Sequence, residues 1–305
     1  MSSKKPLLLL SLCLVFCFAC VYIVVPADLI ATPTLQSVSG WTGMVTGFEE
    51  TETQGTRIYI SLRNSTNDWS AMKAVENEPA ILLTSSGSKT ECPIVIVGTG
   101  KHRIAPGFQI RGFTGGTRKE PEKQLLYVEC PVSEIAAGSN LSLSYQYIVG
   151  AYDLHVPSIE IKKEMLLNLD QVESALVYPF DDSSMVVVNK MGDKISAINN
   201  FSLILTEAMR SDTGLELLWK AENPSDYPNY VHIGEPPVLG NDGIIYGYYV
   251  DPSIADATIA LPKDESEWTT SVLVPADVTG LYIMVSVETR QSKYFINHVI
   301  DISDK

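Results

Sequence analysis

Short segments in which apolar and polar side chains alternate recur along this sequence, and they constrain its fold more than any other feature. Residues 58–63, 141–146 and 281–288 each show the alternation. Successive side chains of a β-strand point to opposite faces, so a period of two is typical of antiparallel strands with one buried face. Turn-forming stretches such as 114–117 and 241–243 lie between these segments. Many short strands separated by turns predict an all-β chain built as sandwiches or barrels.

One segment near the middle of the chain has a helical spacing instead. Met165, Leu169, Val172 and Leu176 recur at intervals of four, three and four residues, which aligns them along one stripe of a helix. Prolines lie on both sides of this segment. The sequence therefore predicts a short helix here, with a strand as the alternative.

Two parts of the chain share a pattern of apolar residues. Apolar side chains follow Gly55 at the third, fifth and seventh positions, and Asn64 follows at the ninth. Gly214 is followed by apolar residues at the same three positions and by Asn223 at the ninth. The pattern predicts two related β units. The alternative is that any two hairpins of an all-β chain look this similar.

In outline, each half of the chain resembles the immunoglobulin-like β-sandwich domains of microbial cell-envelope proteins. In such domains the first hairpin often ends in an Asn-rich corner, which Asn64 and Asn223 would match. The resemblance implies two antiparallel sandwich domains, residues 41–163 and 164–305. The helix that the spacing after residue 165 predicts would then lie near the junction of the two domains.

Cys92 and Cys130 are the only cysteines after the N-terminal apolar run. Two cysteines in an exported domain most simply form one disulfide, and a loop of this length would stabilise the fold by about 4 kcal/mol in the chain-entropy model. Two buried free thiols are the alternative. No Trp lies between the two cysteines, so the Cys–Trp–Cys signature of antibody-type domains is missing.

A run of 19 uncharged residues, 7–25, predicts a membrane-spanning helix, because roughly 20 apolar residues cross the core of a bilayer. Lys4 and Lys5 precede the run, and the next Lys or Arg is Arg57. The positive-inside rule then places the N-terminus in the cytoplasm and the bulk of the chain outside. We expect residues 1–26 to be the uncleaved signal anchor of a single-pass membrane protein.

Two other fates of this apolar run stay open. Cleavage of a signal peptide would release a secreted protein, and lipoprotein processing before Cys20 would leave a lipid anchor. All three fates place the globular part outside the cytoplasm. Residues 27–40 contain Pro33 and several Ser and Thr, and they predict a stalk.

The charge of the chain excludes one class of partner. Its 36 acidic and 22 basic residues give a formal net charge of −14. Such a surface repels the phosphates of nucleic acids, so neither DNA nor RNA is expected as a partner.

No motif for catalysis or for metal binding is recognisable in the sequence. The four histidines are far apart, and none forms a zinc-binding pair of ordinary spacing. There is no Gly-x-Ser-x-Gly elbow, and the glycine-rich stretch 97–101 lacks the full phosphate-loop pattern. The sequence therefore predicts no catalytic residue, no metal ligand and no cofactor.

Two kinds of residue are candidates for contact or modification. Tyr246 and Tyr248 fall on one face of a predicted strand and are candidate ligand contacts, although core packing is the commoner use of such residues. Asn64, Asn140 and Asn200 stand in sequons that an exported protein could carry glycosylated.

These observations favour a membrane-anchored, extracytoplasmic, non-catalytic binding or scaffold protein with an envelope protein or a glycan as its partner. Loops at one end of a sandwich are the expected contact surface. The alternatives are a hydrolase or enzyme subunit with a site assembled from distant loops, and a sensing ectodomain that needs a partner to relay its signal.

Overall fold

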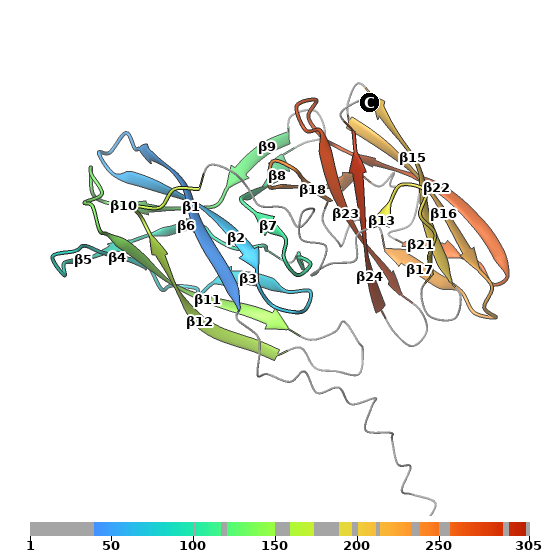
Figure 1. Cartoon of the computed structure of the whole chain (residues 1–305), viewed down its shortest axis with the longest axis horizontal. Helices are drawn as coiled ribbons and strands as arrows, with labels where there is room; N and C mark the ends of the chain where they lie inside the picture. Colours follow the sequence, from blue (N-terminus) through green and yellow to red (C-terminus); the bar gives the residue numbers. More distant parts are fainter. Residues whose placement is uncertain are drawn as a thin grey trace, which may run out of the picture. The chain divides into compact units, whose positions relative to one another are not determined.

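The described part of the protein is built from strands and turns (Figure 1). The structure is a computed structural model, and it describes residues 40–100, 102–116, 121–149, 159–173, 189–196, 201–211, 214–232, 238–249, 257–288 and 293–302. None of these residues is helical, so the all-β prediction is confirmed for them. The predicted anchor, residues 1–26, lies outside the described residues. Among the described residues there is no helix long and apolar enough to cross a membrane.

Two sheets face one another around an apolar core in what we call the N-terminal sandwich. Sheet 1 has the order β1 (Trp41–Glu50), β2 (Thr56–Asn64), β10 (Tyr127–Cys130) and β6 (Ile94–Ile96), with β7 (Gln109–Ile110) paired to β2. Sheet 2 has the order β12 (Ile159–Asn168), β11 (Asn140–Val149), β4 (Ala80–Leu83) and β5 (Lys89–Cys92), with β3 (Ala71–Ala74) paired to β11. Alternate side chains of β2 and β11, such as Ile58, Ile60 and Leu141, are fully buried between the sheets. The predicted apolar face is confirmed in these strands, but the opposite face is not fully exposed: Ser61 of β2 is buried, and its hydroxyl oxygen accepts a hydrogen bond from Gln109 Nε2 over 2.7 Å.

Two further sheets form the C-terminal sandwich. Sheet 3 has the order β13 (Asn189–Lys190), β24 (Lys293–Asp301), β23 (Gly280–Glu288), β18 (Val238–Gly240), β19 (Ile244–Tyr246), β8 (Gly112–Gly116) and β9 (Pro121–Leu125), and β17 (Asn229–His232) pairs with β23 and with β21 (Ala257–Ala260). Sheet 4 has the order β14 (Ile195–Ser196), β15 (Ser202–Ser211), β16 (Gly214–Asn223), β22 (Asp264–Val272) and β20 (Tyr248–Tyr249). Leu217, Trp219 and Ile283 belong to the core between these sheets.

Strands β18 and β19 and the start of β23, all in sheet 3, are buried on both faces. Val238, Ile244 and Leu281 pack into the core of the C-terminal sandwich. Their neighbours Leu239, Ile245 and Tyr282 pack instead into the apolar cluster of the N-terminal sandwich. One-sided burial, which the alternation in residues 281–288 predicts, is therefore wrong at Tyr282.

Main-chain hydrogen bonds reinforce this junction. The hairpin β8–β9 comes from the part of the chain that precedes β11, yet β8 pairs in parallel with β19 of sheet 3. Next to this pairing the amide of Arg111 donates to the carbonyl of Gly243 over 2.8 Å. The ring of Phe108 meets that of Tyr282 edge-on, with centroids 4.8 Å apart. Residues Val38–Lys305 thus form one compact unit.

The helix predicted from residue 165 onward is wrong over residues 165–173, and Leu176 lies outside the described residues. Residues 165–168 end strand β12, which pairs with β11 along its whole length. Met165, Leu167 and Leu169 are all buried whereas Leu166 is 63% exposed, which is the period of a strand. The predicted domain boundary between residues 163 and 164 falls inside this strand, and the division into two domains stays a prediction.

The two related β units have the same local structure. β1 pairs with β2 and β15 pairs with β16, and each ladder contains one bulge, between Val45 and Gly47 and between Leu205 and Glu207. Each second strand then ends in a buried asparagine that closes a corner.

In both corners the asparagine side chain bonds to the chain that follows. Asn64 Nδ2 donates to the carbonyl of Asp68 over 2.8 Å, and its Oδ1 accepts from the hydroxyl of Thr66 over 2.7 Å. Asn223 makes the same two bonds over 2.8 and 2.7 Å, to Tyr227 and from Ser225. Both asparagines are almost wholly buried. The sequon at Asn64 is therefore part of the fold, whereas Asn140 is partly exposed and Asn200 lies outside the described residues.

The predicted disulfide is confirmed. Cys92 and Cys130 are bonded, and both are buried. Cys92 ends β5 and Cys130 ends β10, so the bond joins the two sheets of the N-terminal sandwich.

Replacing Cys92 and Cys130 by Ser should lower the free energy of unfolding by about 4 kcal/mol, since the unfolded chain regains the entropy of an open loop. Urea unfolding of the full chain measures this. A loss below about 1 kcal/mol would contradict a stabilising role of the bond.

Replacing Asn64 by Ala should lower the free energy of unfolding by about 2 kcal/mol or more, because buried carbonyls lose their donor. Asn140→Ala is the matched control, and it should change stability by less than about 0.5 kcal/mol. Equal effects of the two substitutions in urea unfolding would show that the corner carries no special weight.

Candidate functional site

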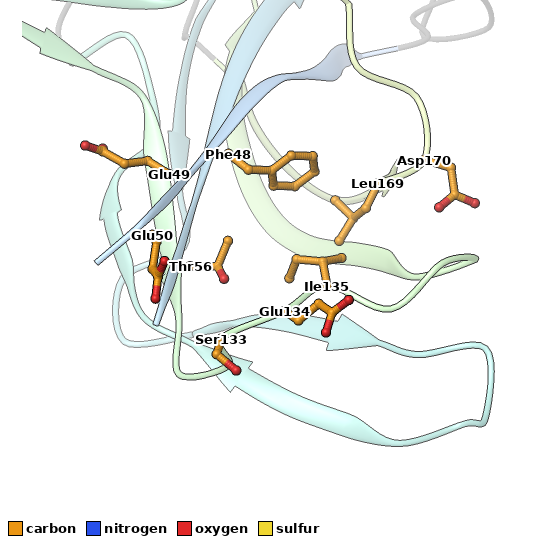
Figure 2. Close-up of a pocket in the computed structure, with 9 residues that line it drawn as sticks. All are labelled: Phe48, Glu49, Glu50, Thr56, Ser133, Glu134, Ile135, Leu169 and Asp170. Atoms are coloured by element: carbon orange, nitrogen blue, oxygen red, sulfur yellow. The ribbon is translucent and has the colours of Figure 1, made fainter. Parts of the chain in front are cut away.

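A hollow of about 340 Å³ opens at one end of the N-terminal sandwich, a size within the range of ligand-binding pockets. One wall comes from the β1–β2 hairpin of sheet 1. The other comes from the connection between β10 and β11 and from the residues that follow β12. The lining residues are Phe48, Glu49, Glu50, Thr56, Ser133, Glu134, Ile135, Leu169 and Asp170 (Figure 2).

The first wall brings a core residue to the surface. Phe48 lies opposite Ile58 across the β1–β2 ladder, so both side chains lie on the face of sheet 1 that covers the core. Ile58 is fully buried, but Phe48 is 41% exposed. The packing between the two sheets is therefore incomplete at this end of the sandwich.

The second wall is held by hydrogen bonds. The amide of Leu169 donates to the carbonyl of Ser139 over 3.1 Å. The carboxylate of Asp170 accepts from the amide of Gly138, with both oxygens 3.0 Å from the nitrogen. These bonds fix Leu169 opposite Phe48, and Figure 2 shows Phe48, Leu169 and Ile135 pointing toward one another.

The carboxylates around these apolar side chains have different surroundings. Glu49 points away from the hollow (Figure 2), accepts a hydrogen bond from the hydroxyl of Tyr59 and pairs with Arg57. No described residue forms an ion pair or a hydrogen bond with the side chain of Glu50 or Glu134. The hollow therefore combines an apolar floor with uncompensated negative charge at its rim, an arrangement that favours cations with an apolar part and repels anions.

The described side chains that line the hollow include no nucleophile paired with a histidine base. The described lining contains carboxylates, hydroxyls and apolar groups but no histidine or cysteine, so it assembles no Ser–His or Cys–His pair. Thr56 Oγ1 already donates to the carbonyl of Val132 over 2.7 Å. Within the described ranges, no group of three or more His, Cys, Asp or Glu side chains could hold a metal ion.

The two tyrosines singled out in the sequence do not share a strand. Tyr246 ends β19 in sheet 3, whereas Tyr248 begins β20 in sheet 4. The side chain of Tyr246 is fully buried, and its hydroxyl donates to Asp242 over 2.7 Å. This is the packing role that was weighed against ligand contact. The side chain of Tyr248 lies outside the description.

Sequence reasoning did not identify the hollow. Phe48 stands in an ordinary strand, and Glu50 belongs to a charged turn of the kind that solvent usually covers. A signal was present in the order of Phe48 before two glutamates at the end of a strand. That order of residues indicates a site only once the structure shows that Ile135 and Leu169, which are distant in sequence, face Phe48.

Comparisons with known proteins returned distant structural similarities. No protein-family model matches the sequence, and no curated protein matches it. The chain is similar to a complex of the SafA pilin with the SafB chaperone of Salmonella enterica, at 10% identity over 86% of this chain and 96% of that chain, with a TM-score of 0.20. It is also similar to the E. coli chaperone DraB, at 9% identity over 85% and 95%, with a TM-score of 0.18. TM-scores this low support no conclusion about the partners or the assembly of this chain.

The burial of Tyr246 predicts a change of stability at alkaline pH. Desolvation, followed by the hydrogen bond to Asp242 and the charge of that residue, raises the pKa of Tyr246 above its ordinary value of about 10. Above pH of about 10 the unfolded chain loses this proton and the folded chain keeps it, so stability falls as pH rises, by up to about 1.4 kcal/mol per pH unit.

Tyr246→Phe should reduce this alkaline loss, whereas Tyr227→Phe, at an exposed tyrosine, should leave it unchanged. Urea unfolding of both variants at pH values on either side of about 10 measures the difference. The same alkaline slope in Tyr246→Phe and the unsubstituted protein would refute the assignment.

Proposed function

We propose that this protein is a non-catalytic binding module, tethered to the membrane and exposed outside the cytoplasm, that engages an envelope partner through the hollow. One observation carries the proposal. Phe48, Leu169 and Ile135 form an apolar floor that the fold leaves open, beside carboxylates that no described residue neutralises. A partner that fills this floor would gain the hydrophobic contacts that the sandwich itself does not make.

Two further features support a location outside the cytoplasm with a tether at the N-terminal end of the fold. The buried disulfide is the kind of bond that persists in oxidising compartments outside the cytoplasm. The chain enters the fold at Trp41, and the hollow lies at the other end of β1, near Glu50. A strand of this length spans about 30 Å. A tether that ends at Trp41 would therefore leave the hollow free for a partner.

The finer kinship with immunoglobulin-like domains of envelope proteins belongs to the same proposal, and the shared corners at Asn64 and Asn223 support it. The hydrolase alternative gains no support from the side chains that line the hollow. Among acid and base groups the described lining of the hollow supplies carboxylates alone, and hydrolase screens on the intact protein test whether they act on a substrate.

Affinity capture with charge-reversal variants tests the proposal. The full chain is expressed with a C-terminal tag in its native host, intact cells are crosslinked, and bound proteins are identified by mass spectrometry. We expect Glu50→Lys/Glu134→Lys to lower recovery of a reproducible envelope partner by about tenfold or more. The matched control is Glu91→Lys/Glu207→Lys, which changes the net charge equally at exposed sites outside the hollow and should leave recovery unchanged.

Recovery that is equal in the two double variants would exclude the hollow as the contact surface. If both variants have the same thermal unfolding midpoint as the unsubstituted protein, neither has lost its fold.

A further inference from the structure

We propose that the ligand of the hollow is an extended, basic segment of a partner protein that pairs with the edge of β1 and places a large apolar side chain on Phe48. This inference rests on the proposed function and names the chemistry of its partner. Three independent features of the described residues lead to it: a strand edge, an apolar floor and a charge.

The strand edge is the open side of β1. β1 is the outermost strand of sheet 1, where its inner side pairs with β2. On its outer side a single parallel bridge joins Val45 to Val172, and the amide of Glu173 donates to the carbonyl of Val45 over 2.9 Å. From Gly47 to Glu50, no described strand pairs with this edge. Main-chain donors and acceptors of such an edge are a template for an added strand.

The apolar floor lies on the face of sheet 1 toward which every second side chain of an added strand would point. Alternate residues of a strand point to opposite faces of a sheet, so one set of side chains would lie on the core face beside Phe48. Leu169 and Ile135 face Phe48 across the hollow (Figure 2). A single large apolar side chain of the added strand would thus complete the packing at the open end of the sandwich.

The charge at the rim selects what flanks the apolar side chain. Glu50 lies at the end of the open edge, and Glu134 borders the floor from the opposite wall. Neither has an ion-pair partner among the described residues. Lys or Arg on either side of the apolar residue would meet these carboxylates, whereas an acidic segment would be repelled. The ligand class is therefore a peptide of alternating basic and apolar residues.

Direct binding of defined peptides to the purified full-length protein tests this inference. The probe is a short fluorescein-labelled peptide with one central Phe flanked by Lys and Thr, and fluorescence anisotropy measures its Kd. Three matched peptides carry Glu for Lys, Ala for Phe, or N-methyl groups on alternate amides. We expect each change to weaken binding by about tenfold or more, because each removes one of the three features.

The protein variants give the reciprocal test. Phe48→Ala and Glu50→Lys/Glu134→Lys should each weaken binding of the Phe–Lys peptide by about tenfold, and Glu91→Lys/Glu207→Lys should leave its Kd unchanged. Added salt should weaken binding to the unsubstituted protein more than to the Glu50→Lys/Glu134→Lys variant. The double charge variant is at the surface, so it remains informative if Phe48→Ala lowers stability.

Two results would overturn the inference. One is that the Phe–Lys peptide does not bind. The other is that its Kd changes neither on N-methylation of the peptide nor on substitution of Phe48, Glu50 and Glu134. They are distinguishable from failure of the proposed function. If the peptides fail while charge reversal at Glu50 and Glu134 still abolishes capture of a partner, the hollow is the contact surface and only the ligand class is wrong.

Discussion

The double burial of sheet 3 is the constraint on which the rest of the structure depends. Strands β18, β19 and β23 carry apolar side chains on both faces, and each face needs a cover. Sheet 4 covers one face, and Phe108 and its neighbours from the N-terminal sandwich cover the other. Burial of a large apolar side chain contributes roughly 1.5–3 kcal/mol. Exposure of Leu239, Ile245 and Tyr282 would therefore weaken the C-terminal sandwich considerably, and the pairing of β8 with β19 keeps the cover in register.

The two ends of the N-terminal sandwich differ for the same reason. Where Phe108 meets Tyr282, the core continues into the next layer, and Leu239 and Ile245 pack into the same cluster. At the opposite end of β1 no further layer of described residues follows. Phe48 remains partly exposed, with Leu169 opposite it. The N-terminal sandwich therefore has its core covered at one end and partly exposed at the other, and the exposed end is the surface proposed for a partner.

Much of the fold could be predicted because its signals are local or nearly so. Alternation locates β2 and β11, the Asn-Asp-Gly turn joins β18 to β19, and two lone cysteines form a bond. The helical interpretation failed at Met165 and Leu169 because it passed over Leu167, which shares their buried face. A spacing of four residues fits both the period of a helix and the period of a strand, and only the pairing of β12 with β11 decides between the two. The hollow was out of reach, since its walls are about 80–120 residues apart along the chain.

The sequence alone determined the strand class, the turns, the two asparagine corners and the pairing of the cysteines. The strands and turns depend on the period of side chains along the chain, the corners depend on short-range hydrogen bonds, and the disulfide follows from the presence of two cysteines after the N-terminal apolar run. Tertiary structure alone decided that β8 and β9 join sheet 3, that Tyr246 lies in the interior, and that Phe48 faces Leu169 of a distant segment rather than a closed core. These outcomes depend on which apolar faces cover one another. Hydrophobic burial has no direction along the chain, so the sequence states how much surface must be covered without stating what covers it.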